Sequence, residues 1–323
     1  MKILFTADLH IKLGQKNVPV EWARNRYKML IEDLVSCQAL VDYFVIGGDI
    51  FDKLPNMEEL EIYYDLVASC KKPTLIYPGN HESLKKDTTF FTYLKKVTHR
   101  LNPLVEVIDD YYTDPTDTFD IIPYNKLKEY EKDEATYFRP VPSSLLFTHV
   151  RGAIEPHVKP EVDLSIFDKW QTVLAGDLHS YENSQRNILY PGSPVTTSFH
   201  RSVVDTGVII FNTDDHTHVW QKLDLPQLIR KTIKAGDDMP ATTYHHTIYE
   251  IEGDLAELGA MEDSDLIDKK LLKRETDTAL MLDPKMSMAE ELKEYLLYIL
   301  QLSEAKVEEV VQVFNNNKEK LDV

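Results

Sequence analysis

The chain has 323 residues, of which 43% are hydrophobic and 28% charged, and its formal net charge is −18 at pH 7. This length can bury a full core, with room for one large domain and a smaller one, and the composition is ordinary for a globular protein. A protein that grips nucleic acid unaided normally carries a basic face. The acidic balance therefore excludes that class unless local cations, metal ions or a partner supply the attraction.

The sequence carries no signal for a membrane or for secretion. No apolar run approaches the ~20 residues that span a bilayer, and the segment before Asp8 is too short for a secretory signal. Cys37 and Cys70 are the only cysteines, and both lie in apolar, helix-like segments, so nothing indicates a disulfide framework. We therefore expect a cytoplasmic protein with no membrane partner.

The first two hundred residues alternate strand-like and helix-like patterns. Short apolar runs predict strands at residues 3–7, 43–46, 73–77, 143–147 and 169–175. Helical spacing predicts helices at residues 22–40, 56–68 and 90–97, the second with Asn56 as its N-cap. Segments 207–211 and 218–223 form a predicted antiparallel hairpin. Because alternating strands and helices favour parallel pairing, we expect an α/β fold with a two-layer mixed β-sandwich core flanked by helices.

The composition changes near Leu225 and Pro226. We assign residues 1–224 to the main domain and residues 225–284 to a small α+β domain, in which segments 227–234 and 244–251 alternate like strands. Residues 285–323 form a predicted helical pair, which a Ser287–Glu290 capping box opens.

Polar side chains follow five of the predicted strands at the point where each strand ends. They are Asp8 and His10, Asp49, Asn80 and His81, His149, and Asp177 and His179. Ligands of open α/β sheets gather at the carboxyl ends of the strands, so we expect these side chains to meet. A single histidine after a strand is more often structural, but five such exits together indicate a metal centre.

The residue types indicate which ions bind and what they do. Mixed oxygen and imidazole ligands suit Mn²⁺, Fe or Zn²⁺ rather than Ca²⁺. Two such ions about 3.5–4 Å apart polarise a phosphate and create a bridging hydroxide nucleophile near neutral pH. Asp49, after two glycines, is expected to bridge both ions. His81, adjacent to the ligand Asn80, is expected to face the substrate and to protonate or stabilise the leaving oxygen.

Five motifs carry a resemblance to the calcineurin-like metallophosphoesterases. They are Asp8-Leu9-His10, Gly48-Asp49, Gly79-Asn80-His81-Glu82, Thr148-His149 and Gly176-Asp177-Leu178-His179. Within that superfamily, the stretches 3–10, 47–52 and 190–194 resemble the SbcD-type DNA repair and recombination nucleases. The compact size is similar to the versions that tailed phages encode. The likeness covers about the first two hundred residues, and beyond Leu225 it is only architectural.

The resemblance implies an activity, cofactors and partners. It implies a DNA nuclease, acting as an exonuclease or endonuclease on double-stranded DNA in recombination, repair or replication. It further implies two divalent ions, Mn²⁺ with Mg²⁺ as the alternative, and a homodimer in the host cytoplasm if the gene belongs to a phage. By the same resemblance, residues 225–284 would cap the DNA. Residues 285–323 would dock on an SbcC-like SMC-type ATPase, which completes an SbcCD-like complex.

The resemblance also implies a role for each strand-end residue. One ion would be held by Asp8, His10, Asp49 and His179, and the other by Asp49, Asn80, His149 and Asp177. His81 matches the catalytic histidine of the family. Asp52 either supports the site from behind the ligands or caps the following helix.

Position 177 departs from the pattern, because the family usually has histidine there. A carboxylate also coordinates divalent ions, but three carboxylates against two divalent ions leave one net positive charge, where two would leave two. We expect the second site to prefer a harder ion such as Mn²⁺ or Mg²⁺ and to polarise the phosphate less. If Asp177 turns away, His157 and His200 are the alternative ligands. The expected DNA-backbone contacts are Lys85, Lys86, His200 and Arg201, although exposed cations are commonly only solvated.

Two other functions remain open. The core motifs alone permit a phosphoesterase that acts on small molecules or proteins, although the C-terminal hundred residues argue against it. Alternatively, the protein is a scaffold for the ATPase that Asp177 has inactivated.

Overall fold

The computed structural model describes residues 1–85, 88–133, 142–240, 242, 244–261, 264–272, 286–300 and 302–317. The chain forms two compact units. One comprises Met1–Ile251 and Glu262–Lys269, and the other comprises Glu252–Met261 and Lys270–Val323. Within the described ranges, no helix combines the length and the apolar character needed to cross a membrane.

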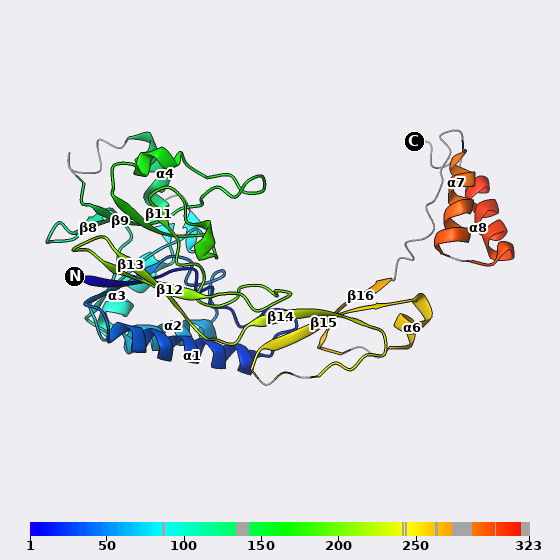
Figure 1. The fold of residues 1–323 in the computed structure, drawn as a ribbon, viewed down its shortest axis with the longest axis horizontal. Helices are drawn as coiled ribbons and strands as arrows, with labels where there is room; N and C mark the ends of the chain where they lie inside the picture. Colours follow the sequence, from blue (N-terminus) through cyan, green and yellow to red (C-terminus); the bar gives the residue numbers. More distant parts are fainter. Residues whose placement is uncertain are drawn as a thin grey trace. The chain divides into compact units, whose positions relative to one another are not determined.

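A six-stranded sheet in the order β13-β12-β1-β2-β3-β6 forms one layer of the first unit. Four of its strands run parallel: β1 (Lys2–Thr6), β2 (Tyr43–Gly47), β3 (Thr74–Tyr77) and β6 (Val105–Val107). The antiparallel strands β12 (Gly207–Asn212) and β13 (His218–Lys222) extend it as the predicted hairpin. Figure 1 shows α1 (Val20–Gln38) and α2 (Met57–Ser69) beside this layer. With α3 (Phe91–Leu101) they share a core with the sheet.

A five-stranded sheet in the order β11-β10-β9-β8-β7 forms the second layer. Its strands are β7 (Tyr112–Thr113), β8 (Phe119–Ile122), β9 (Leu145–His149), β10 (Thr172–Gly176) and β11 (Ile188–Leu189). Helix α4 (Tyr124–Lys132) and the 3₁₀ turn η1 (Leu164–Phe167) pack on its outer face. The inner faces of the two sheets meet in one buried cluster, where the rings of Phe5 and Phe147 lie 5.4 Å apart. The mixed α/β sandwich that we expected is confirmed.

The helices form for the reasons that the sequence indicated. Along α1 the buried residues recur every three or four positions, so that one face meets the sheet. Asn56 is the N-cap of α2, as predicted, and its side chain accepts a hydrogen bond from the backbone N–H of Glu59. The Glu59 carboxylate returns a capping-box bond and also accepts from the N–H of Leu13. This helix is therefore tied to the loop that follows β1.

The remaining elements before the C-terminal helices are a small sheet, a hairpin, a 3₁₀ turn and a short helix. A three-stranded sheet contains β14 (Leu228–Lys234), β15 (His246–Gly253) and β16 (Ile267–Leu272), which confirms the strands predicted after Pro226. Shorter elements are the hairpin β4 (Ser83–Lys85) and β5 (Thr88–Thr89), the 3₁₀ turn η2 (Tyr181–Asn183) and helix α6 (Leu255–Ala260).

The predicted helical pair is confirmed in the second unit. Helix α7 (Met288–Glu294) begins at the Ser287–Glu290 capping box, continues as the π-helical turn η3 (Tyr295–Ile299), and contacts α8 (Glu304–Asn317). The domain boundaries that we drew at 224/225 and 284/285 stay predictions.

Candidate metal centre

The strand ends of both sheets meet at one edge of the sandwich. The Tyr77 hydroxyl at the end of β3 donates to the carbonyl of Thr148 in β9 at 2.8 Å. The Nδ1 atom of His149 lies 2.9 Å from the carbonyl oxygen of Gly47 in β2. These contacts lock the two layers together at the ends of their strands. The cleft at this edge, about 380 Å³ in volume, is lined by His10, Asp49, Asn80, His81, Asp177 and His179.

The backbone is strained where it delivers these side chains. Four of the expected ligands have left-handed φ angles, namely Asp8 (58°), His10 (44°), Asp49 (49°) and Asp177 (102°). This conformation is uncommon for residues other than glycine, and it clusters at functional sites. Backbone hydrogen bonds from Asp8 N to Gly48 O and from His10 N to Asp49 O hold the loops after β1 and β2 against each other.

Glycines leave the space that the imidazole of His149 and the carboxylate of Asp49 occupy. A Cβ on Gly176 would lie 2.6 Å from Nδ1 of His149, and a Cβ on Gly79 would lie 2.6 Å from the backbone N of Asp49. Gly48 is constrained in the same way and also has a positive φ of 84°. The glycines of the quoted motifs are therefore needed because the site is too crowded for a side chain.

One group of ligands is formed by Asp8, His10 and His179. The Nε2 atoms of the two imidazoles lie only 3.1 Å apart. Burial lowers the pKa of His10 to about 3 and also lowers the pKa of His179. Both rings are consequently neutral near pH 7. With Nδ1 of His179 3.1 Å from the Thr197 hydroxyl, this pair of close imidazole nitrogens is suited to bind one cation.

A second group is formed by Asp8, Asp49 and His149, with the amide of Asn80 beside it. The Nε2 atom of His149 lies 2.9 Å from Oδ1 of Asn80 and 3.4 Å from Oδ2 of Asp49. If Nδ1 donates to Gly47, a neutral His149 would point a lone pair at these two acceptors, so a cation is required between them. Burial opposes protonation, but Asp49, then Asp8 and Asp177, raise the pKa of His149 well above its usual value. A proton fills this role until a metal ion replaces it.

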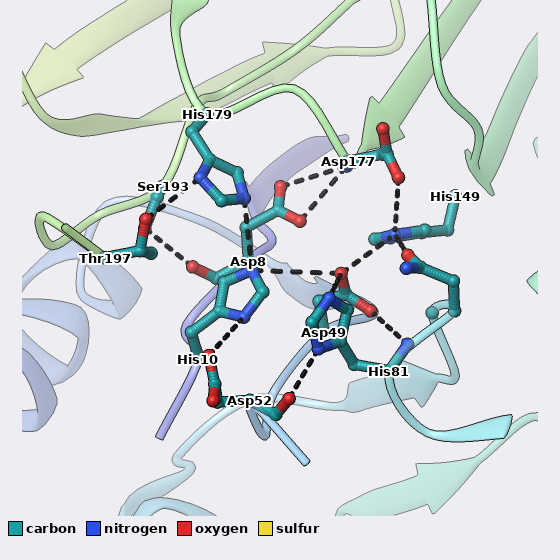
Figure 2. A network of polar contacts seen from close by, with 12 residues as sticks. Asp8, His10, Asp49, Asp52, His81, His149, Asp177, His179, Ser193 and Thr197 are labelled. Carbon is teal, nitrogen blue, oxygen red and sulfur yellow. Dashed lines mark hydrogen bonds and ion pairs between the residues drawn. The ribbon is translucent and has the colours of Figure 1, made fainter. Parts of the chain in front are cut away.

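Asp49 stands between the two groups, as Figure 2 shows. Its Oδ2 atom lies 3.4 Å from Nε2 of His149 and 3.8 Å from Nε2 of both His10 and His81. Its Oδ1 atom accepts a hydrogen bond from the backbone N–H of His81. One carboxylate therefore faces both candidate ion positions, which is the geometry that the bridging prediction requires.

His81 lies at the mouth of the cleft, with 36% of its side chain exposed. Its Nδ1 atom is 2.5 Å from the carbonyl oxygen of Asp52. With that nitrogen donating to the carbonyl, Nε2 faces the cleft, where a substrate can reach it. The same atom lies 3.8 Å from Oδ2 of Asp49, so His81 also forms a third possible ligand group with His10 and Asp49. The Asp52 carboxylate pairs with Lys12 at 2.9 Å and lies 3.8 Å from Nδ1 of His10. The main-chain carbonyl of Asp52 thus orients His81, and the carboxylate of Asp52 lies beside the expected ligand His10.

Glu82 is a central residue of the site for which the sequence indicated no role, although it closes the Gly79-Asn80-His81-Glu82 motif. Its fully buried carboxylate accepts hydrogen bonds from the backbone N–H groups of Asp49, Phe51 and Gly79 at 2.8–3.0 Å. Burial, followed by repulsion from Asp49, raises the pKa of Glu82 to about 7. Glu82 joins the loop after β2 to the loop after β3. The available signal was its place in the Gly79–Glu82 motif, directly after His81.

Arg151 is the second residue that sequence reasoning missed. Its Nε and Nη2 atoms donate to Oδ2 and Oδ1 of Asp177 at 3.0 and 3.2 Å. Asp177 Oδ1 also lies 3.9 Å from Nε2 of His149, so the carboxylate still faces the second ligand group. Among the described residues that line the metal cleft, Arg151 is the only lysine or arginine. The carboxylate at position 177 is thus half of a neutral ion pair.

The other predicted residues lie away from the ligand groups. His157 is exposed in a turn, where its N–H donates to the carbonyl of Ile154. The side chain of His200 lines a neighbouring cavity. Lys85 is exposed in β4, and Arg201 pairs at 2.7 Å with Glu250, which is buried. Lys86 lies outside the described residues. No contact of these residues with DNA is tested, so their role stays a prediction.

Comparison with known proteins identifies the family to which this chain belongs. The family profile of calcineurin-like phosphoesterases matches residues 1–185, a span that contains every ligand of the two groups. The chain belongs to this family. It is 41% identical to "Probable exonuclease subunit 1" of Escherichia phage T5 over 322 residues, which is 96% of this chain and 97% of that one. It is 27% identical to "Putative phosphoesterase 244L" of Invertebrate iridescent virus 6, over 73% of this chain and 86% of that one.

As a calcineurin-like phosphoesterase, the protein is a phosphodiester hydrolase that binds divalent metal ions. The residues present fit such ions. Three buried carboxylates, of Asp8, Asp49 and Asp177, converge with three imidazoles within a few ångströms. Burial, opposed by His149, raises the pKa of Asp8 well above its usual value. Such a concentration of buried negative charge calls for cations.

Proposed function

We propose that the protein is a metal-dependent DNA nuclease that cleaves phosphodiester bonds with two divalent ions. The observation that carries the proposal is the position of Asp49, whose single Oδ2 atom faces His10 and His149 of the two ligand groups. The similarity to "Probable exonuclease subunit 1" of phage T5 over nearly the full length of both chains supports a nucleic acid as the substrate. The resemblance of residues 3–10, 47–52 and 190–194 to the SbcD-type nucleases favours DNA.

The residues have separate roles in this proposal. One ion would be held by Asp8, His10, Asp49 and His179, and the other by Asp49, Asn80, His149 and Asp177. When bound, the ions polarise the phosphate and activate the attacking water. His81, oriented by the Asp52 carbonyl, faces the cleft. To stabilise or protonate the leaving oxygen it would act as the imidazolium, with Nδ1–H on the Asp52 carbonyl and Nε2–H donated to that oxygen. Glu82 holds the backbone of Asp49 in place.

We also propose that a partner subunit binds the C-terminal helical pair. Among the described residues of α7, η3 and α8, only Leu296 and Val307 are buried, while Tyr298, Ile299 and Val310 are exposed. An apolar surface of this kind is typical of a protein interface. An SbcC-like SMC-type ATPase fits the proposal, because it would also supply the DNA affinity that a chain with a net charge of −18 lacks. Mn²⁺ as the ion, a homodimer and a host-cytoplasmic location stay predictions.

The test is cleavage of linear duplex DNA by the purified protein with Mn²⁺, alone and with the ATPase subunit. We expect degradation that stops when the ions are chelated and returns with Mn²⁺. Absence of cleavage in both settings, from protein shown to contain metal, contradicts the proposal. Rapid turnover of a small phosphodiester without any action on DNA would favour the small-molecule phosphoesterase instead. Cleavage that appears only after an Asp177→His substitution would favour the inactive scaffold.

A further inference from the structure

A second cavity opens beside the metal cleft. It has a volume of about 570 Å³, and its lining includes His179 and Thr197, which also line the metal cleft. A chemical group bound in this cavity would therefore lie next to a phosphate at the metal centre, as part of the same substrate molecule. The volume lies within the range of sites that enclose a small organic molecule.

Two aromatic residues form part of the cavity wall. Tyr181 follows His179 closely in the chain and Trp220 lies on β13, and their ring centroids are 5.6 Å apart at an interplanar angle of 31°. The polar end of each ring is already bonded. Trp220 Nε1 donates to the carbonyl of Pro191, and the Tyr181 hydroxyl lies 2.8 Å from Nε2 of His218. These bonds fix the rings, so what they can offer a ligand is aromatic surface.

The charge of the lining selects against a second phosphate. Among the described residues, no lysine or arginine lines the cavity, whereas Glu182 and Asp205 do. Asp205 is paired with Lys222, and the Thr197 hydroxyl contacts Nδ1 of His179. The other polar groups of the lining include the Glu182 carboxylate, the hydroxyls of Ser180 and Ser198, and the imidazole of His200. This combination suits an uncharged, planar group that carries hydrogen-bond donors.

We propose that this cavity binds the nucleoside attached to the phosphate at the metal centre, with its base stacked on the Tyr181 and Trp220 wall. The inference rests on the proposed nuclease function and names the part of the substrate that the metal ions do not contact. Stacking on aromatic side chains tolerates every base because each has a π-face. The cavity would therefore grip DNA next to the cleaved bond without reading its sequence, and it would do so without positive charge.

Two substrates with the same leaving group separate this binding from catalysis. They are p-nitrophenyl thymidine 5′-phosphate and p-nitrophenyl methyl phosphate, of which only the first carries a nucleoside. The readout is the ratio of their kcat/KM values with Mn²⁺. We expect Trp220→Ala to lower the ratio by about 5- to 150-fold, the range for loss of one base–aromatic stack. Trp220→Phe should retain most of the ratio because it keeps an aromatic ring. Tyr181→Leu should lower the ratio because it removes the other ring of the wall.

The matched control is Val219→Ala, one position earlier on β13, where the side chain is 64% exposed and does not line the cavity. Its ratio should equal that of the unmodified protein. An unchanged ratio in both Trp220→Ala and Tyr181→Leu would overturn the cavity proposal while leaving the nuclease intact. If the protein cleaves no phosphodiester, the nuclease proposal fails instead. The cavity is then tested by fluorescence quenching of an oligonucleotide ending in 2-aminopurine, which must be weaker in Trp220→Ala for the cavity proposal to stand.

Discussion

The ion pair between Arg151 and Asp177 makes a prediction about how the second ion is held. Three carboxylates against two divalent ions leave a charge of +1, and the Arg151 guanidinium restores it to +2. Replacing Arg151 by Gln removes that compensation but keeps a side chain of similar length. The Asp177 carboxylate, only 6% exposed, would then be left without its two charge-assisted hydrogen bonds.

The size of the effect follows from the burial of the two partners. Breaking a fully buried ion pair by removing one partner costs about 3–5 kcal/mol. The Arg151 side chain is 42% exposed, so solvent screening reduces this to about 1–2 kcal/mol of unfolding free energy in the metal-free protein. The same uncompensated carboxylate gains more from a cation, so the affinity for Mn²⁺ should rise by about 5- to 30-fold. Stability and metal affinity should thus change in opposite directions.

Asp177→Asn should lower the affinity for Mn²⁺, because it leaves the positively charged guanidinium of Arg151 unpaired beside the site. The double variant Arg151→Gln/Asp177→Asn should bind Mn²⁺ more tightly than Asp177→Asn alone. Isothermal titration calorimetry measures the affinities, and urea unfolding measures the stability. The matched control is Arg186→Gln, which breaks an Arg–Asp pair with Asp168 whose side chains are 46% and 56% exposed. It should cost no more than about 1 kcal/mol. If the two substitutions at 151 and 177 both weaken Mn²⁺ binding and their effects simply add, the charge argument is refuted.

Four further predictions concern the site itself. His81→Asn should reduce DNA cleavage by about 10²- to 10⁴-fold with Mn²⁺ affinity kept, and parallel loss of metal would show that His81 is a ligand instead. Gly79→Ala places a Cβ 2.6 Å from the backbone N of Asp49, so it should destabilise the protein by about 1–3 kcal/mol and weaken Mn²⁺ binding, as followed by urea unfolding and calorimetry. Glu82→Gln offers one oxygen to three N–H donors and should cost about 1.5–3 kcal/mol of unfolding free energy; a cost below about 0.5 kcal/mol would contradict its bridging role. Because the raised pKa of His149 keeps a proton where the ion binds, Mn²⁺ affinity should rise about tenfold per pH unit until the pH exceeds that pKa, with proton release detectable by calorimetry in buffers of different ionisation enthalpy.

The sandwich and the ligand groups could be predicted because each depends on local sequence and one general rule. Apolar runs and helical spacing located the strands and helices, and parallel strands bring their carboxyl ends to one edge. Asp49, His149 and His179 were recognisable because a carboxylate or imidazole directly after an apolar run is unusual. Their convergence required no knowledge of which strands are neighbours.

Glu82 and Arg151 could not be found in this way, because their roles arise from contacts between distant segments. Glu82 is 33 positions from Asp49, and Arg151 is 26 positions from Asp177. On the sequence, Arg151 looks like a charged residue of a surface loop, and the motif that contains Glu82 does not say what its carboxylate contacts. Only the folded chain shows that one carboxylate is fully buried and that one guanidinium compensates the unusual ligand. The cavity beside His179 was out of reach for the same reason, since β13 supplies part of its wall.

The left-handed backbone at Asp8, His10, Asp49 and Asp177 has a consequence for how this enzyme should be mutated. Asparagine adopts positive φ more readily than other non-glycine residues, whereas alanine pays roughly 1–2 kcal/mol there. An alanine scan would therefore release the loops as well as delete the ligands, and it would overstate the importance of every carboxylate. At the three aspartates, substitution by asparagine keeps the shape of the side chain and removes its charge, so a lost ion can be attributed to the lost charge and not to released loops.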